Sequence, residues 1–376
     1  MFIVLIGFAA YEFIRKSTQI SLYWIAFGML LLMLCLRFAQ GTDYFTYYYY
    51  YLITPKLENA EMLFGAVDDL HGEIGWRLIC SLFRTANIRF EILIGMVSLM
   101  EMLCLHRFLK KYSPMRTVSL LFAYPTLYLT YAVSAVRQGL VMMFFLGFMI
   151  DWLCTKKIKR YILATLVCAL IHISAVIFLI LPFIYYYSLN VKRAVIVFAV
   201  SIFVGFLANW ALPKVLADYA YYAWNGVSIV AVAERGVATI IVMYCFHDIL
   251  NKPKERGDLH FLLQIYLYSS VIYCFFIWNS FTASRFSIYF KAVEIVLFAS
   301  ALKKHWVKCY RGIVTYLIIL VMVMYYKNIN SYIAQGGYFE STNVWNYPYI
   351  TVLDQHEIKE WREIPHYLQP YEILMQ

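Results

Sequence analysis

The residues best suited to chemistry in this sequence are three arginines that stand at the ends of apolar runs. Arg37 follows one such run, and Arg137 and Arg285 each precede another. A guanidinium group offers five N–H donors in a planar fork that matches phosphate oxygens. Arg137 and Arg285 are also expected at helix N-termini, which favour anions. A single arginine would more simply extend towards lipid headgroups, but three at one depth predict a site for pyrophosphate or another lipid-linked anion.

Three further residues are candidates for acid–base chemistry beside these arginines. Transfer of a sugar to a hydroxyl group needs a base near the acceptor oxygen and cations on the departing phosphate. Asp43 lies six residues after Arg37 and can share its cavity. His172 is the alternative base, because imidazole titrates near neutral pH. Glu73 is the third candidate, and it also suits the first turn of an amphipathic helix, where an acidic residue is favoured.

Four other residues complete the predicted substrate site. Gln138 can hydrogen-bond the ligand or the adjacent loop, and the sequence leaves both open. Arg235 lies roughly 12 Å inside the apolar run 226–246 at 1.5 Å per residue, so it extends the anion site or braces it. Tyr44 and Tyr289 join the set because aromatic rings stack on sugars. No D-x-D motif or Glu/His cluster accompanies them, so we expect no metal and no cofactor.

The composition is that of a polytopic membrane protein. Of the 376 residues, 63% are hydrophobic and 14% charged, and the mean hydropathy is +0.66, which ordinary soluble domains do not reach. The net charge is +10, but lysine and arginine occur in short clusters between apolar runs, as in cytoplasmic loops of membrane proteins. We therefore exclude nucleic acid as a partner and expect membrane lipids instead.

The apolar runs predict an all-α bundle with about 10–12 transmembrane helices, since each span needs about 20 residues. Basic clusters between the runs are assigned to the cytoplasmic face. Residues 1–326 then form the transmembrane domain, and residues 327–376 form a tail on the opposite, periplasmic face. The candidate spans are 2–14, 19–36, 91–109, 117–135, 138–154, 194–212, 226–246, 261–281, 286–302 and 312–326.

Two irregular features are expected in this bundle. The apolar run 161–187 is flanked by basic clusters on both sides, so we predict that it breaks near His172 into a re-entrant helix pair. Broken backbone at membrane depth is tolerated where it is buried in protein or lines a wet cavity. In the first periplasmic loop, residues 37–90, the apolar positions between Glu73 and Thr85 recur at helical spacing. They predict an amphipathic helix in the plane of the interface.

Together, these motifs resemble those of the EpsG family of bacterial polysaccharide polymerases, within the Wzy-type group. They run in order from residue 37 to about residue 290, and together they are more specific than any one alone. The departure from the family pattern concerns Asp43, which here follows the second helix. The matching motifs are Arg37…Gly41-Thr42-Asp43-Tyr44, Glu73-x-Gly75-Trp76, Ser134-Ala135-Val136-Arg137-Gln138-Gly139, His172-x-Ser174-Ala175 and Ser284-Arg285-Phe286 with Tyr289-Phe290.

The resemblance implies a multi-pass glycosyltransferase of the bacterial cytoplasmic (inner) membrane with a C-type glycosyltransferase-like fold. Its site would face the periplasm or cell exterior and act on undecaprenyl-pyrophosphate-linked repeat units, extending O antigen (as in lipopolysaccharide biosynthesis), capsule or exopolysaccharide. A chain-length regulator is a further expected partner. Two alternatives remain: an O-antigen ligase, expected to carry a large late outer loop, and a lipid-linked oligosaccharide flippase, expected to show inverted repeats and charges near the midplane.

Overall fold

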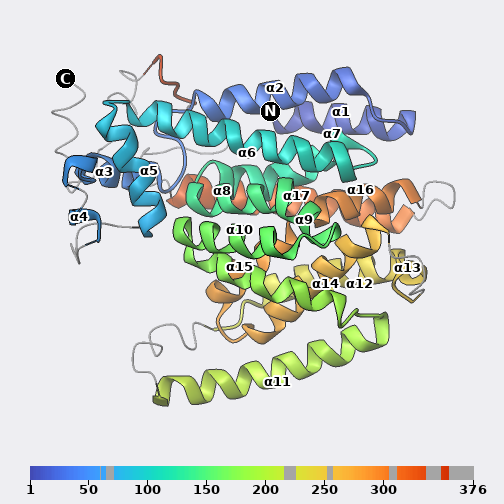
Figure 1. The fold of residues 1–376 in the computed structure, drawn as a ribbon. Helices are drawn as coiled ribbons and strands as arrows, with labels where there is room; N and C mark the ends of the chain where they lie inside the picture. Colours follow the sequence, from blue (N-terminus) through green and yellow to red (C-terminus); the bar gives the residue numbers. More distant parts are fainter. Residues whose placement is uncertain are drawn as a thin grey trace.

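The computed structural model describes residues 1–59, 61–64, 72–215, 226–251, 257–304, 311–335 and 349–354. Over these residues the chain is helical, with two isolated β-bridges and no strand. Most of the helices run along one common direction and pack side by side in a single bundle (Figure 1). This arrangement confirms the predicted all-α membrane architecture.

Four of the described helices are long and apolar enough to cross a membrane. They are Phe90–Tyr112, Val136–Cys154, Val191–Ala211 and Gly312–Asn330, and Ile20–Cys35 and Ile173–Tyr185 are shorter apolar helices. The elements are α1 (Phe2–Arg15), α2 (Ile20–Cys35), α3 (Tyr44–Ile53), η1 (Leu57–Asn59), α4 (Glu61–Phe64), α5 (Ile74–Thr85), α6 (Phe90–Tyr112), α7 (Arg116–Ala123), η2 (Tyr124–Ala132), α8 (Val136–Phe144), η3 (Phe145–Met149), α9 (Ile150–Cys154), α10 (Ile158–Ile171), η4 (Ile173–Tyr185), α11 (Val191–Val215), α12 (Ile229–Cys245), α13 (His247–Asn251), α14 (Asp258–Phe275), α15 (Ser280–Lys291), α16 (Glu294–Lys304) and α17 (Arg311–Gln335).

The centre of the bundle is the continuous helical run formed by α8, η3 and α9. Of its most apolar window, 78% is buried, compared with 17% for Val191–Ala211 and for Gly312–Asn330. Figure 1 accordingly shows α11 at the edge of the bundle. The two π-helical segments η2 and η3 flank α8, and such wide turns are rare and often occur at functional sites. The start of α8 is therefore fixed in position and lies in the interior of the bundle.

The chain breaks at His172, as the sequence predicts. Helix α10 ends at Ile171, His172 is extended with φ −151°, and the 3₁₀ segment η4 begins at Ile173. The two arms pack together, and the Tyr161 hydroxyl donates to the carbonyl of Phe178 at 2.8 Å. The break thus interrupts the helical backbone inside the bundle and leaves one histidine at the bend.

Helices α3, α4 and α5 lie together at one end of the bundle, and α13 lies at the opposite end (Figure 1). We call the first of these the cavity end. Helix α5 has nearly the predicted bounds and buries Trp76 and Cys80, whereas Leu82 of the expected apolar stripe is 53% exposed. A Cβ on Gly75 would lie 2.7 Å from the carbonyl oxygen of Leu170. Glycine at this position therefore lets α5 approach the end of α10.

Residues 349–354 lie at the cavity end. Helix α17 continues to Gln335, past the predicted boundary at residue 326, and most of the predicted tail 327–376 lies outside the described residues. Within the part that is described, Phe38 N–H donates to Ile350 and Val352 N–H to the carbonyl of Leu36, both at 2.9 Å. Residues 350–352 therefore pair with the chain that leads into the first loop.

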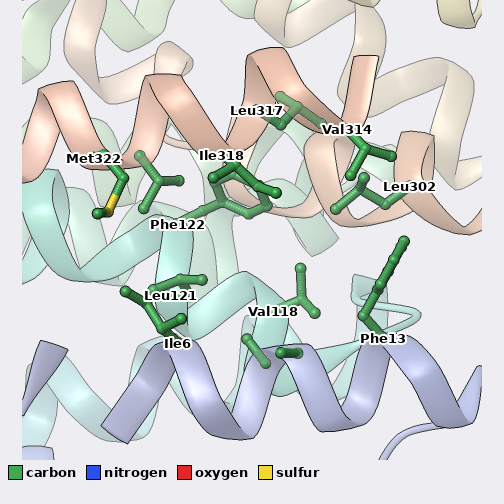
Figure 2. Close-up of a pocket in the computed structure, with 13 residues that line it drawn as sticks. Ile6, Phe13, Val118, Leu121, Phe122, Leu302, Val314, Leu317, Ile318 and Met322 are labelled. Atoms are coloured by element: carbon green, nitrogen blue, oxygen red, sulfur yellow. The ribbon is translucent and has the colours of Figure 1, made fainter. Parts of the chain in front are cut away.

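An apolar groove of about 250 Å³ lies between α1, α7, α16 and α17. Figure 2 shows Ile6 and Phe13 facing Leu317 and Ile318 across it, with Phe122 at its floor. Every side chain that lines it is apolar. Such a groove suits hydrocarbon, but it holds no group that could bind phosphate or move a proton.

Candidate active site

A polar cavity of about 110 Å³ lies at the cavity end of the bundle. Its lining comes from α3, from the start of α8, from the break at His172 and from α15. Five of the residues that the sequence singled out meet here, although they are far apart along the chain. The lining residues are Asp43, Thr46, Tyr47, Ala135, Arg137, Gln138, His172 and Arg285.

Glu73 connects three of the segments beside this cavity. Its Oε2 accepts a hydrogen bond from Arg137 Nη1 at 2.5 Å. Its Oε1 accepts the backbone N–H of Ile173 at 2.9 Å and lies 3.3 Å from His172 Nδ1. One carboxylate therefore fixes α5, α8 and the break after α10 relative to one another.

The surroundings of Glu73 keep it ionised. Burial raises the pKa of this carboxyl group, but the contacts with His172, with the Ile173 N–H and with the Arg137 charge lower it more. The net effect lowers the pKa from 4.5 to about 2. Glu73 occupies the N-cap position of α5 without a side-chain cap hydrogen bond, so its carboxylate bonds to Arg137 and Ile173 and not to the first N–H groups of α5.

Two glycines allow the loops of the site to come close. Gly72 has φ +102°, and a Cβ there would lie 2.8 Å from Arg137 Nη1. Gly41 has φ +105°, and its Cβ would lie 2.5 Å from the carbonyl oxygen of Val133. Positive φ angles suit glycine because it has no Cβ. The residue before Asp43 is docked in turn, since Thr42 N–H donates to Ser134 Oγ at 3.3 Å.

Asp43 and Tyr47 form the α3 wall of the cavity. Asp43 directly precedes α3, and its Oδ1 accepts from the Thr42 hydroxyl at 3.0 Å. Tyr47 lies one helical turn later, with the Arg137 guanidinium carbon 5.7 Å from its ring centroid. Burial raises the pKa of Tyr47, so the phenol stays neutral and can donate. Tyr44, predicted to contact substrate, packs instead against Phe38 and Phe90.

Arg285 brings a positive charge into the cavity from α15. It is an exposed residue, and its guanidinium carbon lies 4.0 Å from the Phe281 ring centroid. Among the described residues it forms no ion pair. Gln138 Nε2 donates to the Arg285 carbonyl at 3.1 Å, so it joins α8 to α15. This partner belongs to α15 and not to the loop beside α8, and Gln138 also lines the cavity, so both roles left open for Gln138 stay predictions.

The position of Arg285 within its helix corrects our prediction. We expected it at a helix N-terminus, but α15 begins at Ser280 and Arg285 lies in its second turn. The helix starts early because the side chain of Asn279 accepts the N–H of Thr282 at 3.0 Å, an N-cap. Arg285 therefore offers its guanidinium group alone, whereas Arg137, second in α8, does stand at a helix start.

Arg37 does not join the other two arginines at the cavity. It is 2% exposed, and its Nη1 donates to the Leu34 carbonyl at 2.7 Å and to Ser98 Oγ at 2.8 Å. Its Nη2 donates to the Ala132 carbonyl at 3.1 Å. The predicted cluster of three is thus a pair, because Arg37 is occupied in holding α2, α6 and the end of η2 together.

Arg235 and Tyr289 also lie outside the lining. Arg235 Nη1 donates to Ser287 Oγ at 2.8 Å, and its guanidinium carbon is 4.2 Å from the Tyr273 ring centroid. These contacts brace α12 against α15, in agreement with the second of the two predicted roles. The buried hydroxyl of Tyr289 hydrogen-bonds Ser174 Oγ at 2.7 Å, which ties the broken segment to α15 instead of presenting the ring to a sugar.

Sequence reasoning missed Thr46 and Tyr47 as cavity residues. The available signal was helical spacing, because Tyr47 is four residues after Asp43 and faces the same side of α3. Within the described parts of the chain, no group of three or more His, Cys, Asp and Glu side chains is arranged to hold a metal ion. The side-chain groups that line the cavity are two guanidinium groups, a carboxylate, an imidazole, a neutral phenol, a threonine hydroxyl and a glutamine amide.

A protein-family model matches most of the chain. The model of a protein family, described as the EpsG family, matches residues 20–349, which takes in every residue of the cavity. No curated protein and no solved structure matches the chain. The matched family indicates a polysaccharide-polymerase type of function in a membrane.

Proposed function

Because the chain belongs to the EpsG family, we propose that it is a polymerase of undecaprenyl-pyrophosphate-linked oligosaccharide repeat units. It transfers the growing glycan from one lipid carrier to the non-reducing end of the next unit. The product is an O antigen, a capsule or an exopolysaccharide, and a chain-length regulator is a proposed partner. The reaction is a glycosyl transfer that needs no metal.

The observation that carries this proposal is the presence of Arg137 and Arg285 in one cavity with Asp43 and His172. A glycosyl diphosphate leaves more easily when cations neutralise its developing charge. Arg285 makes no ion pair among the described residues, so its charge is available to the diphosphate. Arg137 is anchored by Glu73 at 2.5 Å and presents a fixed second donor.

The proposed step accounts for all its bonds. The acceptor hydroxyl oxygen forms a bond to the anomeric carbon of the donor glycan, and the bond from that carbon to the diphosphate oxygen breaks. The hydroxyl proton goes to Asp43 or His172, which both line the cavity. The electron pair of the broken bond remains on the lipid diphosphate, where Arg137 and Arg285 stabilise it.

The proposed orientation puts the cavity on the periplasmic or exterior side of the inner membrane. Basic residues favour cytoplasmic ends of membrane helices. Lys303 and Lys304 close α16 at the end of the bundle away from α3 and α5 (Figure 1). Lipid-linked units would then be joined after they have crossed the membrane.

The flippase alternative has one observation in its favour, the charged side chains within the bundle. Lys291 Nζ lies 2.5 Å from Glu294 Oε1 and 3.3 Å from Glu234 Oε1. The space beside them is about 20 Å³, room for one water molecule. A sugar does not fit there, so these charges favour a structural role and leave the polymerase as the better proposal.

The test compares polymer ladders on gels from cells in which only the variant chain is present. We expect Arg137→Ala and Arg285→Ala to give single-repeat product at unchanged protein level. Arg89→Ala is the matched control, because Arg89 directly precedes α6 at the cavity end and its side chain is 65% exposed. Full-length ladders from both cavity variants would overturn the proposal, and accumulation of precursor on the cytoplasmic side would favour the flippase.

A further inference from the structure

We propose that His172 is the base that removes the acceptor proton, and that Glu73 is a positioning residue that orients its imidazole. This inference rests on the proposed glycosyl transfer and goes beyond it, because the cavity alone leaves Asp43 and His172 as equal candidates.

His172 is held by its backbone, while both of its ring nitrogens are buried and are left without a hydrogen-bond partner in the described chain. His172 has an extended backbone conformation and separates α10 from η4. Its backbone N–H still donates to the Cys168 carbonyl at 2.9 Å. The side chain is 14% exposed and lines the cavity. Among the described residues neither ring nitrogen has a well-aligned hydrogen bond, although Nδ1 lies 3.3 Å from Glu73 Oε1. Catalytic hydrogen bonds are often this long before substrate binds.

The contact with Glu73 decides which ring nitrogen can act. An ionised carboxylate beside Nδ1 favours the tautomer with its proton on Nδ1, which leaves the lone pair on Nε2. The low pKa of Glu73, about 2, keeps the carboxylate charged throughout the neutral range. The same charge stabilises the imidazolium that forms when Nε2 accepts a proton, as in other carboxylate–histidine pairs.

Glu73 also sets the position of the base relative to the leaving group. Its two oxygens divide between Arg137 at 2.5 Å and His172 at 3.3 Å. The cation that holds the diphosphate and the base that deprotonates the acceptor are therefore fixed by one side chain. A Cβ on Gly72 would lie 2.8 Å from Arg137 Nη1, so the residue before Glu73 must be small for this arrangement to close.

Asp43 is assigned a different task. Its carboxylate accepts from the neighbouring Thr42 hydroxyl at 3.0 Å, and a carboxylate is ordinarily a weaker base than imidazole by about 2 pH units. The charged and titratable groups around His172 are Asp43 and Tyr47 from α3, Glu73 from the start of α5, Arg137 from α8, and Arg285 and Tyr289 from α15. In this setting Asp43 orients sugar hydroxyl groups.

The proton balance of the step is then complete. The acceptor O–H proton moves to His172 Nε2 as the new glycosidic bond forms and the bond to the diphosphate breaks. The imidazolium is held beside the Glu73 carboxylate until it passes its proton to water. The enzyme returns to its starting state with a neutral imidazole.

The test uses the full chain in lipid vesicles, supplied with lipid-linked repeat units extracted from cells that lack the chain. We expect His172→Ala to lower kcat by about 10²- to 10⁴-fold, the usual contribution of a general base, with KM within about twofold. Added imidazole should restore part of the rate to His172→Ala, which a purely structural defect would not allow. His172→Gln should lose the same rate, because an amide does not accept a proton.

Glu73 and Asp43 variants separate positioning from catalysis. Glu73→Gln should lower kcat by about 10- to 100-fold, as loss of an orienting partner does, and imidazole should not restore it. Asp43→Asn should raise KM more than it lowers kcat. Wild-type kcat in His172→Gln, or no rescue of folded His172→Ala by imidazole, would overturn the inference while leaving the polymerase proposal intact. Absence of a ladder from the wild-type chain itself would overturn both.

Discussion

Two groups of paired charges in the described part of the chain differ in the space beside them. The cavity cluster, Glu73 with Arg137 and His172, borders a space of about 110 Å³. The inner cluster, Lys291 with Glu234 and Glu294, surrounds about 20 Å³. Both hold a basic side chain within 2.5 Å of a carboxylate oxygen. Only the cavity cluster has room for a ligand, and Arg285, which forms no ion pair in the described chain, lines that space.

The comparison shows that charge within a membrane bundle does not by itself mark a site. Buried ion pairs are expensive to form, and they often contribute little net stability, although breaking one is strongly destabilising. Lys291 has 5% of its side chain exposed and two acidic partners, so its charge is neutralised within the protein. Arg285 forms no ion pair in the described chain, so its charge remains available to a ligand. We expect variants of the two clusters to fail in different assays.

The largest effect expected from breaking one of these ion pairs is on catalysis, in Arg137→Ala. This variant removes a donor from the leaving diphosphate and leaves Glu73 without its ion pair, so the polymerisation rate should fall by about 10²- to 10³-fold, the effect of deleting one such stabilising donor. Arg137→Lys should recover only part, because lysine lacks the planar fork. Initial rates in vesicles measure both. A polymerisation rate within threefold of wild type in Arg137→Ala would show that the cavity cluster is not needed for catalysis.

The next largest effect is on stability, in Lys291→Ala. Removing this lysine leaves Glu294 without its ion pair and leaves Glu234 with Lys327 alone, at 3.9 Å, and the free energy of unfolding should fall by about 3–5 kcal/mol. Thermal unfolding in detergent measures the loss, and the activity per folded molecule should stay near wild type. The matched control is Lys291→Met combined with Glu234→Gln and Glu294→Gln, which should recover most of the stability. Unchanged stability together with a lost polymerisation rate would show that the inner cluster is functional, so that the two clusters would not differ in role.

A smaller effect concerns pH and sharpens the role of Glu73. Its folded pKa, about 2, lies below the ordinary 4.5, so the stability that it contributes is complete above about pH 5 and is lost as pH falls towards 2. The difference in melting temperature between wild type and Glu73→Gln should shrink as pH falls from about 4 towards 2. A difference that stayed constant over this acidic range would show that these contacts do not depend on the charge of Glu73.

The smallest effect is expected for Arg89→Ala at the cavity end. Arg89 is 65% exposed, and its Nε lies 3.2 Å from Glu91 Oε2, an arrangement that contributes about 0–1 kcal/mol. Ladder length and melting temperature should both match the wild type. A tenfold loss of polymerisation would mean that positive charge anywhere at this end attracts substrate, and that the cavity pair has no special place.

The sequence predicts the membrane class, the helix α5 and the break at His172, because hydropathy and helical spacing are local properties. It also brings Asp43, Arg137 and Arg285 to one end, since each stands near the end of an apolar run. The sequence cannot show that Arg37 lies outside this group of residues. An arginine at a helix end has the same sequence pattern whether it binds a ligand or a backbone carbonyl. Arg37 donates to the carbonyl of Ala132, a partner that only the packing of η2 supplies.

The depth of Arg285 in α15 was beyond sequence reasoning for a related reason. The helix starts at Ser280 because Asn279 caps it, whereas hydropathy alone places the start several residues later. The π-helical turns of η2 and η3 leave no clear sequence signal, yet they set the register in which Arg137 meets Glu73. Glu73 itself has two plausible uses from sequence, and only its contacts with Arg137 and Ile173 distinguish them.

The most direct measurement counts products in vesicles that contain the purified full chain and native lipid-linked repeat units. The account predicts one free lipid diphosphate for each new glycosidic bond, with both counts falling together in Arg285→Ala. Bond formation without release of lipid diphosphate, or an unchanged rate in Arg285→Ala, would contradict the claim that this cavity holds the leaving diphosphate during glycan transfer.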